Sequence, residues 1–280
     1  MKFANLHLHS TYSDAGFTPQ QLVYIGKALG YGALALTDHE TDGGCKEFMR
    51  FAKREGIETV TGAEFYAELD GRKMHLTALD FDQDAPELRA LIQKRCDLQA
   101  MWLKECFDQG VERGVIKGVV WEDVLDVAGQ DAWLCTDTLA EVLRRKKAIP
   151  EEGLGYVKEH TTKDPEMKAK KAPYPTAEEV IKAVRSAGGV IALAHPTEGL
   201  IGIVRPLVEL GLNGIEVDHP GIAPEVLPLC ARAAELYNLY PCGGTDHTGP
   251  MSCCGGKHAV PVFNGITEEQ FLMLKERRLG

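Results

Sequence analysis

Histidines and carboxylates occur in short motifs near the ends of apolar segments, and both are metal-binding residue types. In Asn5-Leu6-His7-Leu8-His9-Ser10, His7 and His9 are separated by one residue. Because successive side chains of a strand point to opposite faces, both imidazoles of this motif share one face. Nitrogen and oxygen ligands without cysteine thiolate favour ions such as Mn²⁺, Zn²⁺ or Fe²⁺. The motif therefore predicts a metal site.

Other candidate ligands are spread along the chain, and together they strengthen this prediction. They are Asp14, His39, Glu64, His75, His195, Asp246 and His247. A lone histidine at a strand end is more often a hydrogen-bonded structural residue than a ligand, but independent coincidences do not account for the whole set. We therefore expect a site that holds more than one metal ion.

The composition bounds the class of protein. A chain of 280 residues, 44% hydrophobic and 26% charged, can bury a full core as one large domain or as one domain with an insertion. The formal net charge of −10, without a basic tail, argues against duplex nucleic acid as a partner. Because no apolar signal region or membrane-length segment is present, we expect a cytoplasmic protein without a membrane partner.

The candidate ligands need strands to position them, and strand and helix patterns alternate at both ends of the chain. We expect strands over 3–8, 33–36, 58–61, 74–79, 190–194, 214–217 and 240–243. We expect helices over 18–28, 45–55, 176–187, 204–210, 224–238 and from 267. This alternation predicts a parallel sheet. Most candidate ligands follow a strand, where barrels of parallel strands place their active sites.

The middle of the chain has a different pattern. Long helical patterns over 88–109, 121–127 and 138–147 replace the alternation, and residues 150–175 are lysine-rich and irregular. We therefore expect residues 96–171 to form a helical insertion that caps the active site.

The order of the motifs resembles the PHP (polymerase and histidinol phosphatase) family, specifically its stand-alone metal-dependent phosphoesterases. The motifs are His7-Leu8-His9-Ser10, Tyr12-Ser13-Asp14, Thr37-Asp38-His39, Gly62-Ala63-Glu64, His75, Ala194-His195-Pro196 and Gly243-Gly244-Thr245-Asp246. The resemblance implies an α/β fold, a distorted (β/α)7 TIM-like barrel of residues 1–95 and 172–280. It also implies two or three divalent metal ions at the carboxyl ends of the strands.

The resemblance also implies which residues share a metal ion. The first ion would be held by His7, His9, Glu64 and Asp246; the second by Glu64, His75 and His195; the third by Asp14, His39 and His247. A bridging Glu64 agrees with its chemistry, because the two oxygens of a carboxylate can span two cations. The family usually ends this motif in Asp-x-His, whereas here Asp246 and His247 are adjacent and Thr248 occupies the usual histidine position. Whether a third ion binds is therefore left open.

Closely spaced cations of this kind support hydrolysis of a phosphate ester by a hydroxide that bridges the metals at Glu64. His39 or His247 would assist the leaving group. We expect a small phosphorylated substrate, such as a sugar phosphate, a nucleotide or a cyclic phosphodiester. The candidate substrate contacts are Arg144, Arg145, Arg205 and His219. A solvated helix end is the plainer interpretation of Arg144 and Arg145. For Arg205 and His219, a surface or structural role and a substrate contact are equally open.

Three other functions stay open. An exonuclease or oligonucleotide phosphatase would use the same metals, but it would benefit from a basic or aromatic groove that the sequence does not display. An amidohydrolase-type C–N hydrolase also begins with His-x-His, although Asp14, His39 and Glu64 favour phosphorus chemistry. A non-catalytic, metal-stabilised module is compatible with the adjacent Asp246 and His247. The oligomeric state does not follow from the sequence.

Overall fold

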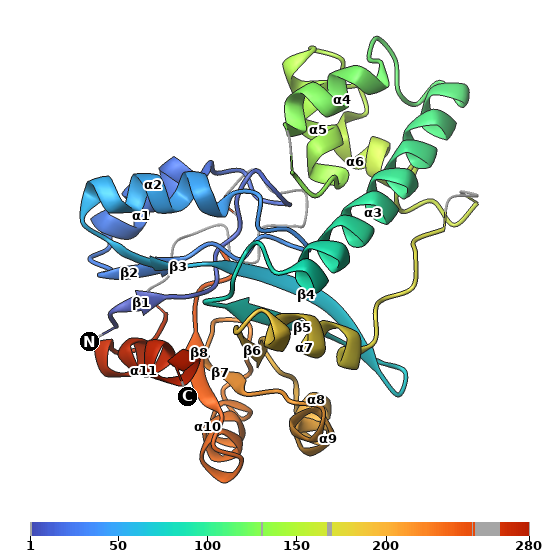
Figure 1. The fold of residues 1–280 in the computed structure, drawn as a ribbon. Coiled ribbons are helices and arrows are strands. Elements are labelled where there is room, and N and C mark those ends of the chain that lie inside the picture. The colour runs from blue at the N-terminus through green and yellow to red at the C-terminus, as the bar shows by residue number, and fades with distance from the viewer. Residues whose placement is uncertain (1, 130, 167–169, 248, 250–263, 280) are drawn as a thin grey trace.

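The computed structural model describes residues 2–129, 131–166, 170–247, 249 and 264–279, and it shows an α/β fold with two sheets (Figure 1). The first sheet is parallel, with the order β1 (Ala4–Asn5), β2 (Ala33–Ala35) and β3 (Glu58–Val60). Its connections are α1 (Pro19–Ala28) and α2 (Cys45–Glu55). Thr18 caps α1, and its hydroxyl accepts a hydrogen bond from the backbone amide of Gln21.

The second sheet contains five strands and is mixed rather than parallel. Its order is β4 (Gly62–Leu69), β5 (Arg72–Leu79), β6 (Val190–Leu193), β7 (Gly214–Asp218) and β8 (Tyr240–Gly243). Only β6, β7 and β8 run parallel, since β5 is antiparallel to both β4 and β6. The predicted parallel sheet is therefore wrong for β4 and β5. Asp70 and Gly71 adopt φ values of 50° and 77°, as a tight hairpin turn requires.

Single bridges and hydrogen bonds connect the two sheets. His39 bridges to Glu64, and Leu8 bridges to His247. The backbone amide of Asp246 donates to the carbonyl of His7. The described residues form two sheets rather than one closed barrel, but these contacts bring the segments after β1, β2 and β8 together with the start of β4. The candidate ligands lie at this junction.

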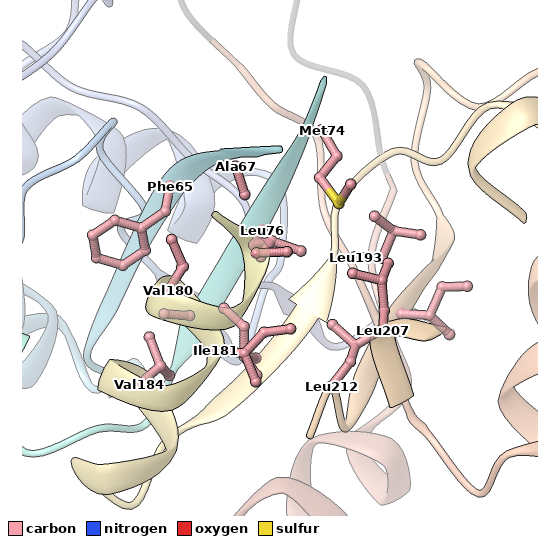
Figure 2. Packing of buried hydrophobic residues seen from close by; sticks show 14 of the residues in the cluster. Phe65, Ala67, Met74, Leu76, Val180, Ile181, Val184, Leu193, Leu207 and Leu212 are labelled. Carbon is pink, nitrogen blue, oxygen red and sulfur yellow. The ribbon is translucent and has the colours of Figure 1, made fainter. Parts of the chain in front are cut away.

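The largest hydrophobic cluster lies between the second sheet and helix α7 (Ala177–Ser186) (Figure 2). Phe65 and Leu76 from the sheet pack with Val180 and Ile181 from the helix, and all four are buried. Helix α7 begins at a capping box of Thr176 and Glu179. The remaining helices around this sheet are α8 (Glu198–Ile201), α9 (Val204–Glu209), α10 (Leu227–Leu236) and α11 (Glu268–Leu279).

The middle of the chain forms helices with a hydrophobic cluster of their own. They are α3 (Pro86–Glu112), α4 (Trp121–Ala128), α5 (Thr136–Arg145) and α6 (Gly153–Glu159). Leu88 of α3 packs in the sheet cluster, whereas Phe107 of the same helix packs in the second cluster. Figure 1 shows α3 extending from the sheets to the other three helices. Helix α6 was not predicted, and it forms where Val157 packs into the second cluster.

Within the described ranges, no helix combines the length and the apolar character that crossing a membrane requires.

Candidate metal centre

Glu64 lies at the centre of a cluster of histidines, and its two oxygens face different partners. Oε1 lies close to ring nitrogens of His7 (3.3 Å), His75 (3.1 Å) and His195 (3.1 Å). Oε2 lies close to ring nitrogens of His9 (3.4 Å) and His39 (3.0 Å). The Glu64 side chain is only 1% exposed. This arrangement is the one that a carboxylate bridging two cations needs.

Asp246 joins the two histidines of the first motif. Its Oδ1 lies 3.0 Å from His9 Nε2 and 3.8 Å from His7 Nε2, and the two Nε2 atoms are 3.2 Å apart. The ligand atoms of these three residues lie within 4.8 Å of one another. The same limit holds for Glu64 with His75 and His195, and for Glu64 with His9 and His39. Three candidate ligand groups therefore share members, as closely spaced cations require.

Buried atoms without hydrogen bonds indicate that a cation fits here. Among the described residues, none makes a hydrogen bond of acceptable geometry with His9 Nδ1, His39 Nδ1 or Glu64 Oε2, and all three atoms are buried. An unsatisfied buried polar group costs about 1–3 kcal/mol. A metal ion offsets this cost because it accepts the lone pairs. Imidazole and carboxylate donors match the preferences of Mn²⁺, Zn²⁺ and Fe²⁺.

Charge pairing shifts the pKa values in the cluster. Burial lowers the pKa of His9, but Asp246 and Glu64 outweigh burial and raise that pKa to about 10. Burial raises the pKa of Glu64, but His7 and the neighbouring imidazoles hold it well below its usual range. Without metal, Glu64 is therefore charged and His9 is protonated. A cation must displace this proton, so acid weakens metal binding.

Asp14 and His39 lie together on one side of the cluster. Asp14 Oδ2 is 3.6 Å from His39 Nε2, and Asp14 Oδ1 is 3.9 Å from His9 Nδ1. The neighbouring Asp38 faces elsewhere, since it accepts hydrogen bonds from the hydroxyls of Ser10 (2.7 Å) and Ser13 (2.6 Å). Asp38 thereby fixes the loop that presents Asp14.

His247 belongs to none of the candidate ligand groups among the described residues, so the structure does not support its predicted roles as a third-site ligand and as a catalytic acid. Its buried ring stacks on Phe17, with the ring centroids 5.5 Å apart. The physical reason is the pairing of His247 with Leu8, because paired residues on neighbouring strands point to the same face. That face is opposite to the one that carries His7. Thr248, the alternative, lies outside the described residues.

The predicted arginine contacts lie away from the histidine cluster. Arg205 is 75% exposed and pairs with Glu209 on its own helix. Arg144 and Arg145 both pair with Glu141 on α5. These two arginines also line a cavity of about 420 Å³ between α5 and the loop of residues 11–18. The structure thus gives Arg205 no contact with the cluster and places the α5 arginines beside the Asp14 loop.

His219 lies beneath the cluster rather than at its opening. Its Nδ1 accepts a hydrogen bond of 2.9 Å from the Gly221 backbone amide, and its ring centroid is 5.3 Å from that of His7. Burial lowers the pKa of His219 to about 4. The buried, neutral imidazole fits a supporting role better than substrate contact.

Three residues that the sequence analysis did not single out also touch the cluster. Glu216 Oε1 lies 2.7 Å from His7 Nδ1. The ring centroids of Tyr66 and Trp133 lie 5.0 and 5.5 Å, respectively, from the centroid of the His39 ring. Glu216 could have been identified from the sequence, because it is a carboxylate within an apolar strand. Trp133 could not, since it belongs to the helical segment, which is distant from the ligands in the sequence.

Comparisons with known proteins agree with this geometry. A model of the PHP domain matches residues 5–110. The chain is 31% identical to a 5'-3' exoribonuclease from Haemophilus influenzae over 90% of both chains. It is 30% identical to a phosphoribosyl 1,2-cyclic phosphate 1,2-diphosphodiesterase from Eggerthella lenta over 88% of this chain and 94% of that one.

A solved structure has the same fold. The protein, from Bifidobacterium adolescentis and provisionally described as a metal-dependent phosphoesterase, superposes with a TM-score of 0.79 at 22% identity. The superposition covers 99% of this chain and 96% of the other. The matches to the two curated relatives, at 31% and 30% identity, extend over 90% and 88% of this chain. The protein therefore belongs to the PHP family of metal-dependent phosphoesterases.

Proposed function

We propose that the protein hydrolyses a phosphate ester of a small phosphorylated metabolite and that divalent cations bind on both sides of Glu64. The observation that carries this proposal is that the two Glu64 oxygens face different histidines. Oε1 faces His75 and His195, and Oε2 faces His9 and His39. His7 lies beside Oε1 but only 3.2 Å from His9, so it also belongs with His9 and Asp246. Separate ligand groups therefore meet at this carboxylate.

The proposed ligands follow from the clusters. His7, His9, Asp246 and Glu64 hold one cation, and Glu64, His75 and His195 hold the second. Asp14 and His39 offer a third position, which has fewer ligands because His247 faces away. When bound, such cations polarise phosphoryl oxygens and lower the pKa of water.

The exposure of the ligands indicates the side from which substrate arrives. The side chains of His75, His195 and Asp246 are 28%, 25% and 22% exposed, whereas those of His7 and His9 are fully buried. A phosphate group therefore approaches the open side formed by His75, His195 and Asp246. His39, at 9% exposed, is the remaining candidate for assisting the leaving group.

The nature of the substrate is a separate part of the proposal. One relative is named for action on RNA and another for action on a cyclic sugar phosphate. Near the cluster, Tyr66 stacks between His39 and Tyr174, at 5.0 Å from each, and Trp133 is only 6% exposed. Trp133 therefore provides little open surface for stacking bases, whereas Tyr66 and Tyr174 are partly exposed. The buried Trp133 and the net charge of −10 favour a small phosphorylated substrate, and exonuclease activity is the second candidate.

Two features of the fold support a finer proposal. The bridges from His39 to Glu64 and from Leu8 to His247 are consistent with a distorted (β/α)7 barrel of residues 1–95 and 172–280. The separate cluster of α3–α6 and the contact of Trp133 with His39 are consistent with a helical insertion, residues 96–171, that covers the centre.

Analysis of the hydrolysis products tests the function. Protein loaded with Mn²⁺ is assayed for inorganic phosphate released from monoesters, and for the monoester or nucleotide products of cyclic diesters and short oligoribonucleotides by chromatography. Glu64→Gln is the inactive control. Faster turnover of small esters than of oligoribonucleotides supports the proposal. Turnover confined to oligoribonucleotides establishes the exonuclease, and no hydrolysis of any phosphate ester contradicts both.

A further inference from the structure

Glu216 lies on β7 behind the histidine cluster, and it contacts two of the proposed ligands. Its Oε1 is 2.7 Å from His7 Nδ1, and its Oε2 accepts a hydrogen bond of 2.5 Å from the backbone amide of His195. The side chain is only 1% exposed. One buried carboxylate therefore links the segments that follow β1 and β6.

The contact with His7 determines which ring nitrogen faces the cluster. With Nδ1 hydrogen-bonded to Glu216, Nε2 points toward Glu64 at 3.3 Å and His9 Nε2 at 3.2 Å. A carboxylate that accepts from the second nitrogen of a metal-binding histidine fixes the ring orientation and raises its basicity. Glu216 stands in this relation to His7.

The contact with His195 acts on the backbone. His195 has a φ of 29°, in a region that residues other than glycine rarely adopt. The hydrogen bond to Glu216 helps to hold this conformation, in which His195 Nε2 lies 3.1 Å from Glu64 Oε1. Glu216 thus acts on the ring of one proposed ligand and on the main chain of the other.

We propose that Glu216 is a positioning residue that couples the two cation positions, a proposal that rests on the proposed function. His7 belongs to the first position and His195 to the second, so loss of Glu216 loosens both. The two donors face different oxygens of Glu216, so a glutamine can accept from only one of them, and its NH₂ group faces the other. The hydrogen bond that remains is also weakened, because its acceptor no longer carries a charge.

Metal titration with a matched control tests the proposal. Metal-free wild-type, Glu216→Gln and Asp218→Asn proteins are titrated with Zn²⁺ by calorimetry. Asp218 is on the same strand and pairs with Lys2 and Asn264, away from the cluster. We expect Glu216→Gln to weaken the affinity of both Zn²⁺-binding steps by about 10- to 100-fold, which is the typical effect of removing a residue that hydrogen-bonds to a metal ligand. Asp218→Asn should leave both steps unchanged. Weakening of one step only, or of neither, overturns the coupling.

A second measurement does not depend on the variant folding. In wild-type protein loaded with Zn²⁺ and labelled with ¹⁵N in histidine, the Nδ1 proton of His7 should be present, hydrogen-bonded and slow to exchange with solvent. An unprotonated Nδ1 in His7 overturns the role of Glu216. Failure of the wild-type protein to bind two equivalents of Zn²⁺ would instead contradict the proposed function, so the two failures are distinguishable.

Discussion

His39 and Glu64 are bridge partners at the junction of the two sheets, and Glu64 Oε2 lies 3.0 Å from His39 Nδ1. His39 follows the first sheet and Glu64 belongs to the second. The proposed cation positions and the junction of the sheets therefore share the same side chains, so metal binding and the stability of the fold should be linked.

Removal of metal should lower thermal stability. A cation at 100 times its dissociation constant stabilises the folded state by about 2.7 kcal/mol if the unfolded chain does not bind it. The melting temperature, measured by circular dichroism with and without a chelator, should fall on chelation and recover with Mn²⁺. Glu64→Gln should show a much smaller difference. Equal melting temperatures of the wild-type protein in both conditions would contradict the linkage.

Glu64→Gln should abolish most of the activity and release metal. The change removes the charge while nearly keeping the shape of the side chain. Loss of a residue that only hydrogen-bonds to a metal ligand lowers metal affinity or activity by about 10- to 100-fold, so loss of a bridging ligand should lower them further. Elemental analysis and turnover measure the two effects. Glu68→Gln, on the same strand, is the matched control and should behave like the wild type. A loss below about tenfold with unchanged metal content rejects the bridge.

His247→Ala and His39→Ala should differ in kind. His247 packs on Phe17, so its loss should lower the melting temperature while metal content stays unchanged. His39 faces Glu64 and Asp14, so its loss should reduce turnover and shift the Mn²⁺ requirement upward. Melting curves and Mn²⁺ activation curves separate the two. A raised Mn²⁺ requirement in His247→Ala would restore it as a ligand.

Metal affinity should rise with pH. The pKa of His9 is raised to about 10, so in the metal-free protein His9 holds a proton through neutral pH, and a cation must displace it. For each proton that the cation displaces, the metal affinity should rise about tenfold for every unit by which the pH increases, as long as the pH stays below that pKa. Competition against a chelator of known affinity, corrected for the chelator's own protonation, measures this slope. An affinity that does not change between mildly acidic and mildly alkaline pH would contradict proton displacement.

Local signals predicted much of the secondary structure. Thr18 with Pro19, and Thr176 with Glu179, identify the starts of α1 and α7 because capping acts over a few adjacent residues. The candidate ligands were identifiable because their residue types are unusual at the ends of apolar strands. The sequence also indicates the turn at Asp70-Gly71, but it did not identify β4 before that turn, so the hairpin of β4 and β5 was not predicted.

The ligand chemistry, the family resemblance and the local elements could be predicted from the sequence, because each depends on neighbouring residues or on the order of motifs. Three relations became visible only in the folded chain: His247 packs on Phe17, Glu216 contacts both His7 and His195, and Trp133 reaches His39. These relations depend on the register between segments far apart in the chain. A shift of one residue in a strand pair moves every side chain to the other face, and no local pattern specifies that register alone.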